Sequence, residues 1–260
     1  MHIVVCLKQV PDTNNVKWTK ENNLLREGMI SILNPYDEEG LNCALDIKKR
    51  FRNVKITAIS MGPMQAKNVL EYALARGCDR AILLCDKAFA GSDTLATGTI
   101  LANAIKKLIP DFDLIVCGQF ALDGDTAQTG ATIAGCLDIE LASYVEKIIN
   151  ADKNVSILNQ KYDEGISIIE VKNPSVACII NKAQKVQDLK IASWVRAQDI
   201  GVEIFGIDDI GLNKNEAGIL GSPTFVSKAF KLEHNRVQKQ IEKNICEFIK
   251  EICESAGKNE

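Results

Sequence analysis

The segment Gly118–Gly130 is the part of the sequence best suited to hold a ligand. It follows the uniformly apolar run Leu114–Cys117 and leads into a helix that we predict over residues 126–137. Glycines let a backbone approach a ligand closely, and the free N–H groups at a helix start favour a phosphate. We therefore predict a nucleotide loop here, in preference to a simple helix cap. Its candidate binding residues are Gly118, Gln119, Phe120, Ala121, Leu122, Asp123, Gly124, Asp125, Thr126, Ala127, Gln128 and Thr129.

The charged and nucleophilic residues of the sequence do not form a recognisable metal site. Asp123 and Asp125 are open to three interpretations: metal ligands, partners of sugar hydroxyls, or acceptors for the loop's own amides. The nine cysteines include no C-x-x-C pair, and there are only two histidines. Zinc and iron–sulfur sites need clustered ligands, so we predict buried free thiols and no metal.

Other nucleotide and hydrolase signatures are missing from the sequence. There is no G-x-x-x-x-G-K-[ST] loop and no G-x-G-x-x-G after the first predicted strand. Residues 90–94 resemble the phosphate loop of ATP pyrophosphatases but lack its paired glycines, so we interpret them as a helix cap. With only His2 and His234, no catalytic Ser–His–Asp or Cys–His set is predicted. A nucleotide pocket without catalytic side chains suits a cofactor that brings its own chemistry.

Strands and helices alternate over residues 1–140, which predicts a parallel sheet with helices on both faces. The predicted strands cover residues 2–7, 54–60, 80–85 and 114–117. They are uniformly apolar, as a sheet covered on both faces requires. Ligands bind beyond the carboxyl ends of such strands, which places the candidate site among residues 7–11, 60–62, 86–92 and 118–130.

The second half of the chain has a different pattern. Residues 145–149, 155–162, 166–171 and 176–180 are predicted as short antiparallel strands, a hairpin extension of the sheet. Residues 182–235 show little periodicity, and a loop of this length is usually functional or lies against a partner. A helix with one apolar face is predicted over residues 237–254. We divide the chain into a nucleotide-binding α/β domain, residues 1–181, and a loop and C-terminal arm, residues 182–260, whose loop is a candidate for docking a partner.

Composition excludes some classes of partner. The 260 residues are 46% hydrophobic and 25% charged, with a net charge of −3, so no basic field attracts nucleic acid or anionic lipid. No run approaches the roughly 20 apolar residues of a membrane span. The first residues are interpreted as a strand and not as a signal peptide. We expect a cytoplasmic protein without membrane insertion.

Four sequence blocks resemble the electron transfer flavoprotein beta (small) subunit family, of FixA-like type. They are residues 5–12 (V-C-L-K-Q-V-P-D), 34–38 (N-P-Y-D-E), 60–65 (S-M-G-P-M-Q) and the Gly118–Gly130 loop. A fifth, residues 221–224 (G-S-P-T), lies near the C-terminal arm. The blocks occur in family order and span most of the chain. The resemblance implies an adenine nucleotide alpha hydrolase-like fold, and a nucleotide site that adds Cys6, Leu7, Lys8, Val10, Asn34, Pro35, Tyr36, Asp37, Met61 and Gly62 to the loop residues.

The resemblance allows two cofactors at this site, FAD or AMP. Some family members hold a structural AMP there, and electron-bifurcating members hold a second FAD. Members of the AMP type often carry Asp at the position of Gly124 and Cys at that of Asp37. Gly124, Thr126 and Ala127 are similar to the bifurcating branch, so FAD is favoured.

Two departures from the family pattern affect the expected contacts. Phe120 stands where the family usually has Gln. The family's docking loop, usually N-E-P-R-Y-P-x-L-P, is replaced by residues 184–192 (Q-K-V-Q-D-L-K-I-A). Leu189 and Ile191 remain candidates for docking a dehydrogenase, with ordinary packing as the alternative for Ile191.

The resemblance also implies partners. They are the alpha (large) subunit of the electron transfer flavoprotein and a dehydrogenase of acyl-CoA or hydroxy-acid type. A bifurcating member also uses NADH and ferredoxin or flavodoxin. The alternative function is an adenine-nucleotide-binding regulatory module of universal-stress-protein type, against which the residue 8–12 and 34–37 blocks argue.

Overall fold

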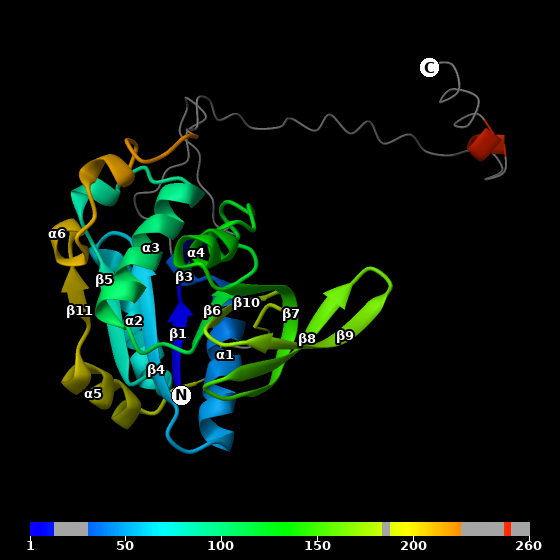
Figure 1. Cartoon of the computed structure of the whole chain (residues 1–260), viewed down its shortest axis with the longest axis horizontal. Helices are drawn as coiled ribbons and strands as arrows, with labels where there is room; N and C mark the ends of the chain where they lie inside the picture. The colour runs from blue at the N-terminus through cyan, green and yellow to red at the C-terminus, as the bar shows by residue number, and fades with distance from the viewer. Residues whose placement is uncertain (13–30, 184–187, 225–246, 251–260) are drawn as a thin grey trace. The chain divides into compact units, whose positions relative to one another are not determined.

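The computed structural model describes residues 1–12, 31–183, 188–224 and 247–250 (Figure 1). Residues Met1–Ser227 form one compact unit, and residues Lys228–Glu260 form a second. Of the second unit only residues 247–250 are described, and they are helical. The predicted helix 237–254 otherwise lies outside the described residues, as do residues 13–30. The functional division after residue 181 stays a prediction.

A nine-stranded sheet runs through the first unit in the order β11-β5-β4-β1-β6-β10-β7-β8-β9. Neighbouring strands from β11 to β7 pair in parallel, and β7-β8-β9 pair antiparallel. The α/β class with a largely parallel sheet is therefore confirmed. The strands are β1 (His2–Cys6), β4 (Lys55–Met61), β5 (Arg80–Leu84), β6 (Leu114–Gly118), β7 (Glu140–Ala151), β8 (Val155–Tyr162), β9 (Gly165–Lys172), β10 (Ser175–Ile179) and β11 (Glu203–Phe205). A separate ribbon pairs β2 (Gln9–Pro11) with β3 (Ser31–Leu33).

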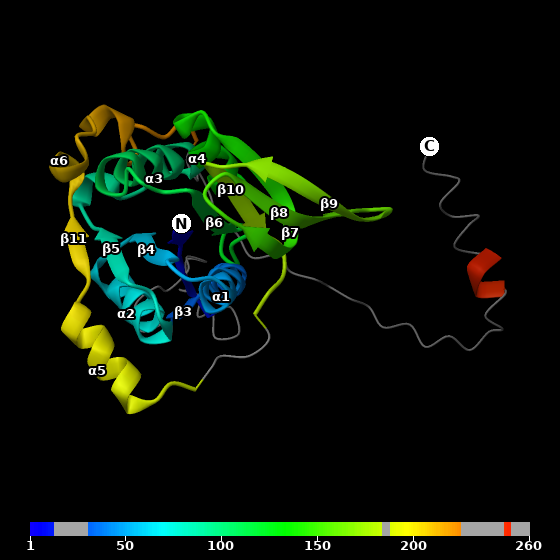
Figure 2. The same ribbon diagram turned by 60° about the horizontal axis from the view of Figure 1, so that its bottom comes forward.

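Helices cover both faces of the sheet (Figure 2). One face is packed by α1 (Pro35–Arg50), α2 (Lys67–Arg76) and α5 (Ile191–Ile200), and the other by α3 (Thr94–Leu108), α4 (Thr129–Leu137) and α6 (Ile207–Ile210). Alternate residues of β1 point into the two layers: Ile3 and Val5 belong to the first core and Val4 and Cys6 to the second. This is why the strand is apolar throughout. Short 3-10 turns lie at Met64–Ala66, Lys87–Phe89 and Lys214–Glu216.

Three predictions about elements are wrong. The run 176–180 was expected to be antiparallel, but β10 inserts in parallel between β6 and β7. The helix expected from Thr126 begins only at Thr129, so the loop before it is longer. Residues 191–216, expected as loop, contain α5, β11 and α6, and β11 adds an edge strand beside β5. Short elements of this kind are stabilised by packing on the sheet, which local periodicity does not report.

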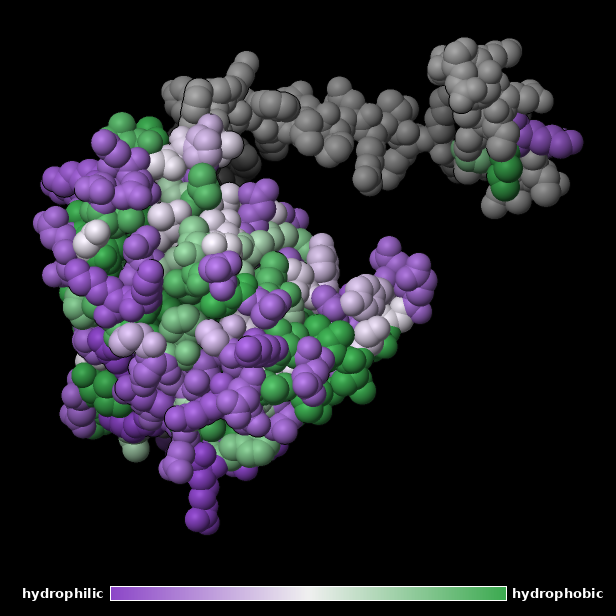
Figure 3. Space-filling view, viewed as in Figure 1, coloured by the Kyte–Doolittle hydropathy of each residue, from purple (hydrophilic) through white to green (hydrophobic). Residues whose placement is uncertain are grey.

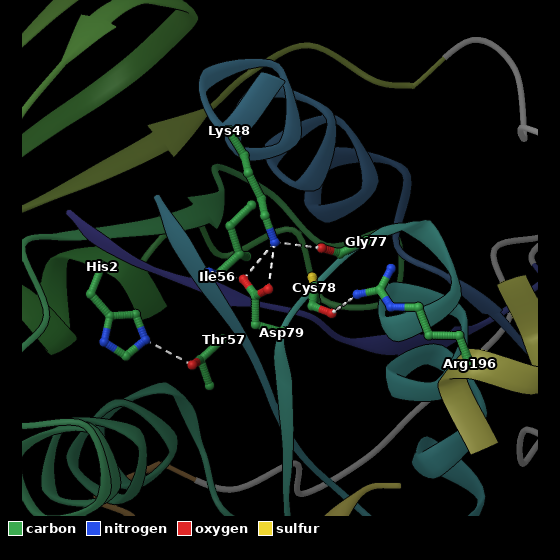
Figure 4. A network of polar contacts seen from close by, with 8 residues as sticks. All are labelled: His2, Lys48, Ile56, Thr57, Gly77, Cys78, Asp79 and Arg196. Atoms are coloured by element: carbon green, nitrogen blue, oxygen red, sulfur yellow. Dashed lines mark hydrogen bonds and ion pairs between the residues drawn. The ribbon is translucent and has the colours of Figure 1, made fainter. Parts of the chain in front are cut away.

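The amino-terminal edge of the sheet is held by polar contacts between helices and the turn before β5 (Figure 4). The Lys48 ammonium group, from α1, donates to the carbonyl of Gly77 at 3.0 Å and pairs with the Asp79 carboxylate at 2.6 Å. Arg196, from α5, donates to the carbonyl of Cys78 at 3.0 Å. These bonds fix α1 and α5 to the turn that ends α2. They lie at the edge of the sheet opposite to the carboxyl ends of the strands.

The surface mixes polar and apolar residues, with hydrophobic surface near the base of the β8–β9 hairpin (Figure 3). Ile166 and Ile168 of β9 are among the exposed apolar side chains. Within the described ranges, no helix is both long and apolar enough to cross a membrane.

Candidate nucleotide site

A cavity of about 340 Å³ opens at the carboxyl edge of the sheet, between β1, β4 and β6. The chain leaves β1 toward β4 on one side, and later reaches β6 on the other side of β1. Crevices at such a change of direction are where open α/β sheets bind ligands. The cavity volume lies at the lower end of the range of about 300–1,000 Å³ that is typical of small-molecule sites.

Asp37 joins the two strand ends that flank the cavity. One carboxylate oxygen accepts from the backbone N–H of Lys8 at 2.7 Å, and the other accepts from the N–H of Gly118 at 3.0 Å. The carbonyl of Lys8 accepts from the N–H of Asn34 at 2.9 Å. Residues 8, 34–37 and 118, which are far apart in the sequence, are therefore held together by two bonds to the Asp37 side chain and one between backbone groups.

Gly118 allows this close approach. A Cβ atom at Gly118 would lie 2.3 Å from Asp37 Oδ1 and 2.9 Å from the Asp37 backbone nitrogen. No other residue type fits there without moving the first turn of α1. This explains in steric terms why a glycine ends β6.

The loop over the cavity is fixed at both ends by side chains. Lys8 Nζ pairs with Asp123 Oδ1 at 2.7 Å, and Thr94 Oγ1 donates to Gln128 Oε1 at 2.8 Å. Between these contacts, Asp125 and Ala127 adopt left-handed backbone conformations, with φ of 51° and 56°. Strained conformations of this kind in non-glycine residues concentrate at ligand sites.

Two buried polar atoms on the cavity wall have no hydrogen-bond partner among the described residues. They are Asn34 Oδ1 and Ser60 Oγ, from residues that are each only 1% exposed. Unpaired buried polar atoms are costly. Adjacent apolar side chains, Ile59 and Leu101, also line the cavity. This combination fits a purine, which has flat apolar faces and hydrogen-bonding edges, so the residues present fit an adenine nucleotide.

Positive charge at the site comes mainly from the backbone. Within the described part of the chain, Lys8 is the only basic residue on the cavity wall, which also carries the carboxylates of Asp37, Asp93 and Asp125. The N-termini of both α3 and α4 border the cavity, since Thr94, Thr97 and Thr129 line it. Helix N-termini offer free N–H groups and partial positive charge. One or two phosphates suit such a wall better than a highly charged polyphosphate.

Burial dominates the titration of Asp37. It raises the pKa of Asp37 to about 7, against the opposing effects of the N–H donors of Lys8 and Gly118 and of the Asn34 side chain. The thiols beneath the cavity are also perturbed. The hydrogen bond with Cys6 and burial raise the pKa of Cys117 well above its usual value, and burial does the same for Cys178. These thiols stay protonated, so they are not set up as nucleophiles.

Most of the sequence-predicted site residues line the cavity. They are Cys6, Leu7, Lys8, Asn34, Asp37, Met61, Gly118, Gln119, Phe120, Ala121, Gly124, Asp125, Thr126, Ala127, Gln128 and Thr129. The others, Val10, Pro35, Tyr36, Gly62, Leu122 and Asp123, lie off its wall. Val10 is buried in the β2–β3 ribbon, the Tyr36 ring packs 5.4 Å from that of Phe120, and Asp123 acts through Lys8. Whether any of them binds a cofactor stays a prediction.

The sequence prediction missed part of the wall. The additional residues are Ile59, Asp93, Thr94, Thr97, Leu101 and Cys117, whereas Ser60 and Ser92 fall in the predicted ranges 60–62 and 86–92. Asp93 does cap α3, as expected, because its Oδ1 accepts from the N–H of Ala96 at 3.0 Å. The cap signal was visible in residues 90–94, and its position after a strand could have placed it at the site.

The two docking candidates lie at the start of α5. Ile191 is 83% exposed, so ordinary packing does not explain it, whereas Leu189 is half-buried against the core. Trp194 and Val195 extend the exposed apolar surface, and the Trp194 ring lies 6.5 Å from that of Tyr72. Residues 184–187 of the replaced docking loop lie outside the described residues.

The fold and the cavity define an α/β subunit with a nucleotide-type pocket; across the described ranges, no cluster of potential metal ligands accompanies it. Comparison with known proteins agrees with this class. The family model described as "Electron transfer flavoprotein domain" matches residues 23–195. The chain belongs to the electron transfer flavoprotein family, among its beta, FixA-like subunits. It is therefore an electron-transfer subunit.

Individual relatives match over most of both chains. An electron transfer flavoprotein subunit beta of Clostridium acetobutylicum is 41% identical over 95% of this chain and 94% of the relative. The caffeyl-CoA reductase-Etf complex subunit CarD of Acetobacterium woodii is 40% identical over 88% of this chain and 87% of the relative. Protein FixA of Azorhizobium caulinodans is 36% identical over 88% and 84%.

Proposed function

We propose that the cavity between β1, β4 and β6 holds the adenylate part of FAD, with AMP as the alternative ligand. The observation that carries the proposal is the pair of unpartnered buried atoms, Asn34 Oδ1 and Ser60 Oγ, on a wall that also carries the apolar side chains of Ile59 and Leu101. FAD is favoured over AMP because Gly124 leaves space: a Cβ atom added there would meet nothing within 4 Å.

The roles of the chain's own residues follow from their contacts. Asn34 and Ser60 would supply hydrogen bonds to the adenine or ribose, while Ile59 and Met61 would cover its faces. The N–H groups at the start of α4, with Thr126 and Thr129, would hold phosphate. When bound, FAD supplies hydride and single-electron chemistry. No side chain of this subunit is assigned a bond-breaking role.

We infer that the subunit works as a heterodimer with a large flavoprotein subunit and passes electrons to or from a dehydrogenase of acyl-CoA or hydroxy-acid type. The printed name of the Acetobacterium woodii relative places that protein in a reductase–Etf complex. If this chain bifurcates electrons, its further partners are NADH and ferredoxin or flavodoxin. The cytoplasm is the proposed compartment, since all seven described cysteines are free.

The proposal is tested by co-expressing this chain with the large subunit that accompanies it and measuring the released nucleotides by chromatography. Two FAD per heterodimer are expected. One FAD plus one AMP would support the nucleotide site but would show that this subunit holds AMP, which would contradict both FAD at this site and bifurcation. One FAD with no second nucleotide would contradict the proposed site itself.

A further inference from the structure

The segment Ala217–Thr224, which contains the G-S-P-T block, is hydrogen-bonded to the turn that opens α3. The N–H of Gly218 donates to Ser92 Oγ at 3.0 Å, and the N–H of Asp93 donates to Ser222 Oγ at 2.8 Å. Thr224 donates twice to Asp93 Oδ2, from its N–H at 3.0 Å and from its Oγ1 at 2.7 Å. Two segments more than 120 residues apart are thus joined by four bonds.

Two glycines of the segment Ala217–Thr224 lie where an added side chain would not fit. Gly218 has φ of 58°, and a Cβ atom there would lie 2.3 Å from the carbonyl oxygen of Ala88. A Cβ atom at Gly221 would lie 2.3 Å from the backbone carbon of Glu216. Both obstacles are backbone atoms and cannot turn aside. Gly218 therefore lets the segment lie close to the chain that leads into α3, and Gly221 lets the segment fold back on its own preceding turn.

The other side of the same turn is the nucleotide cavity. Ser92, Asp93 and Thr94 line the cavity, and Thr94 bonds to Gln128 across it. Ser222 and Thr224 do not line the cavity. Asp93 thus uses one carboxylate oxygen to cap α3 and the other to hold Thr224.

We propose that the segment Ala217–Thr224 is a latch that positions the Ser92–Thr94 wall of the nucleotide site through Asp93, so that seating of the segment and retention of the nucleotide stabilise each other. The inference rests on the proposed nucleotide site. Such coupling is reciprocal. Nucleotide binding should therefore stabilise the seated segment by the same free energy by which the seated segment stabilises nucleotide binding. Asp93 is a positioning residue in this account.

Variants of the segment test the coupling from outside the cavity. Ser222→Ala removes the acceptor for the Asp93 N–H, and Thr224→Val removes one donor to Asp93. In the heterodimer stripped of nucleotide, we expect the double variant to bind AMP and FAD at least about fivefold more weakly. Titration calorimetry with AMP, and with FAD after refilling of the large subunit, measures the affinity.

Asp93→Asn separates positioning from simple electrostatics. Asn still caps a helix, but its amide nitrogen cannot accept from Thr224. Removing a carboxylate near a phosphate would by itself strengthen anion binding, whereas loss of the latch weakens it. We expect about tenfold weaker AMP binding by Asp93→Asn.

Asp86→Asn is the matched control. Asp86 also uses its two oxygens to join a cap to a distant segment, accepting from the N–H groups of Ala88 at 2.9 Å and Ile207 at 3.0 Å. It does not line the cavity. Asp86→Asn should therefore leave AMP affinity unchanged.

Hydrogen exchange distinguishes coupling to the nucleotide from a purely structural role of Asp93. In the wild-type heterodimer, AMP should slow exchange of the Gly218 and Thr224 amides, and in Asp93→Asn it should not. Wild-type affinity in the Asp93 and latch variants, or an equal loss in Asp86→Asn, would overturn the latch. If the wild type binds neither AMP nor FAD, the proposed nucleotide site itself fails.

Discussion

Asp37 is the residue that joins the two strand ends flanking the site. Its carboxylate joins the ends of β1 and β6 while it is buried at the start of α1. Burial raises its pKa to about 7 from an ordinary value of 3.8. The folded protein therefore binds one proton more than the unfolded chain between these two values, and its stability falls as pH rises through that window.

The first prediction follows from this loss of stability with rising pH. Asp37→Asn should be less stable than the wild type at pH 5, because the amide nitrogen has no lone pair for the second N–H donor, whereas the hydroxyl oxygen of the protonated Asp37 carboxyl group keeps one. The gap should narrow by pH 8, as the wild type loses up to about 4 kcal/mol from ionising this group. Denaturant unfolding of the nucleotide-free protein at several pH values measures it. Parallel curves for the two proteins would show that Asp37 does not titrate in this range.

Gly124 is the residue on which the choice of cofactor depends. We expect Gly124→Asp to weaken FAD binding by at least about tenfold while AMP binding changes little, because the new carboxylate fills space beside the phosphates and repels the second one. Gly124→Ala is the control and should stay within about 0.5 kcal/mol of wild-type stability. Equal losses for AMP and FAD would contradict the role of this space.

Individual residues were predictable where they belong to a contiguous block. The residues of 118–129 and the pair Asn34 and Asp37 could be assigned to one site because each block follows a strand end. Ser60 fell in the predicted range 60–62 without being singled out, and Thr97 was missed, since a hydroxyl inside a strand or helix gives no local signal. Their place on the cavity wall depends on how β4 and α3 pack.

At the scale of elements, α3 and α4 must lie close together so that both N-termini reach the cavity. A Cβ atom at Gly98 of α3 would lie 2.4 Å from Thr132 Cγ2 of α4. The two helices therefore touch through a glycine. This contact sets the distance between the two positive helix ends that face the phosphates.

We predict that Gly98→Ala destabilises the protein by about 1–3 kcal/mol, the usual cost of overpacking. Thr132→Ala in the same chain should restore only part of the loss, because it removes Cγ2 but leaves a Cβ atom 2.5 Å from the one added at position 98. Thermal unfolding of both single variants and the double variant measures the coupling. A double variant as unstable as Gly98→Ala would show that the clash lies elsewhere.

Element types were more predictable than their pairing. Apolar runs with strand length were recognised at β1, β6 and β10, but a run such as Val176–Ile179 looks the same in either direction of pairing. The parallel insertion of β10 between β6 and β7 is decided by long-range packing. The start of α4 was placed three residues early because Thr126 is a good cap, whereas the left-handed conformation of Ala127 prevents a helix there.

At the scale of the whole molecule, the nucleotide site and the proposed docking surface are separate. Ile191, Trp194 and Val195 of α5 form an exposed apolar group, none of which lines the cavity. The helix is anchored at the opposite edge of the sheet through Arg196 and Cys78. A variant on its exposed side should therefore leave the cofactor in place.

Ile191→Asp should lower the rate of electron transfer to the partner dehydrogenase by at least about tenfold, since a charge would have to be buried at the contact, while the nucleotide content stays that of the wild type. Phe51→Asp, which changes another exposed apolar residue at the end of α1, is the control and should transfer electrons normally. Stopped-flow reduction of the dehydrogenase measures both. An unaffected rate in Ile191→Asp would show that the dehydrogenase does not dock on α5.

The most direct measurement is an experimental density map of the heterodimer as purified, at a resolution that separates a purine from water. The account predicts an adenylate group between the ends of β1, β4 and β6, with its polar atoms bonded to Asn34 Oδ1 or Ser60 Oγ and its phosphate at the start of α4. A map that shows only water in this cavity, with the adenine nucleotide bound elsewhere or absent, would contradict it.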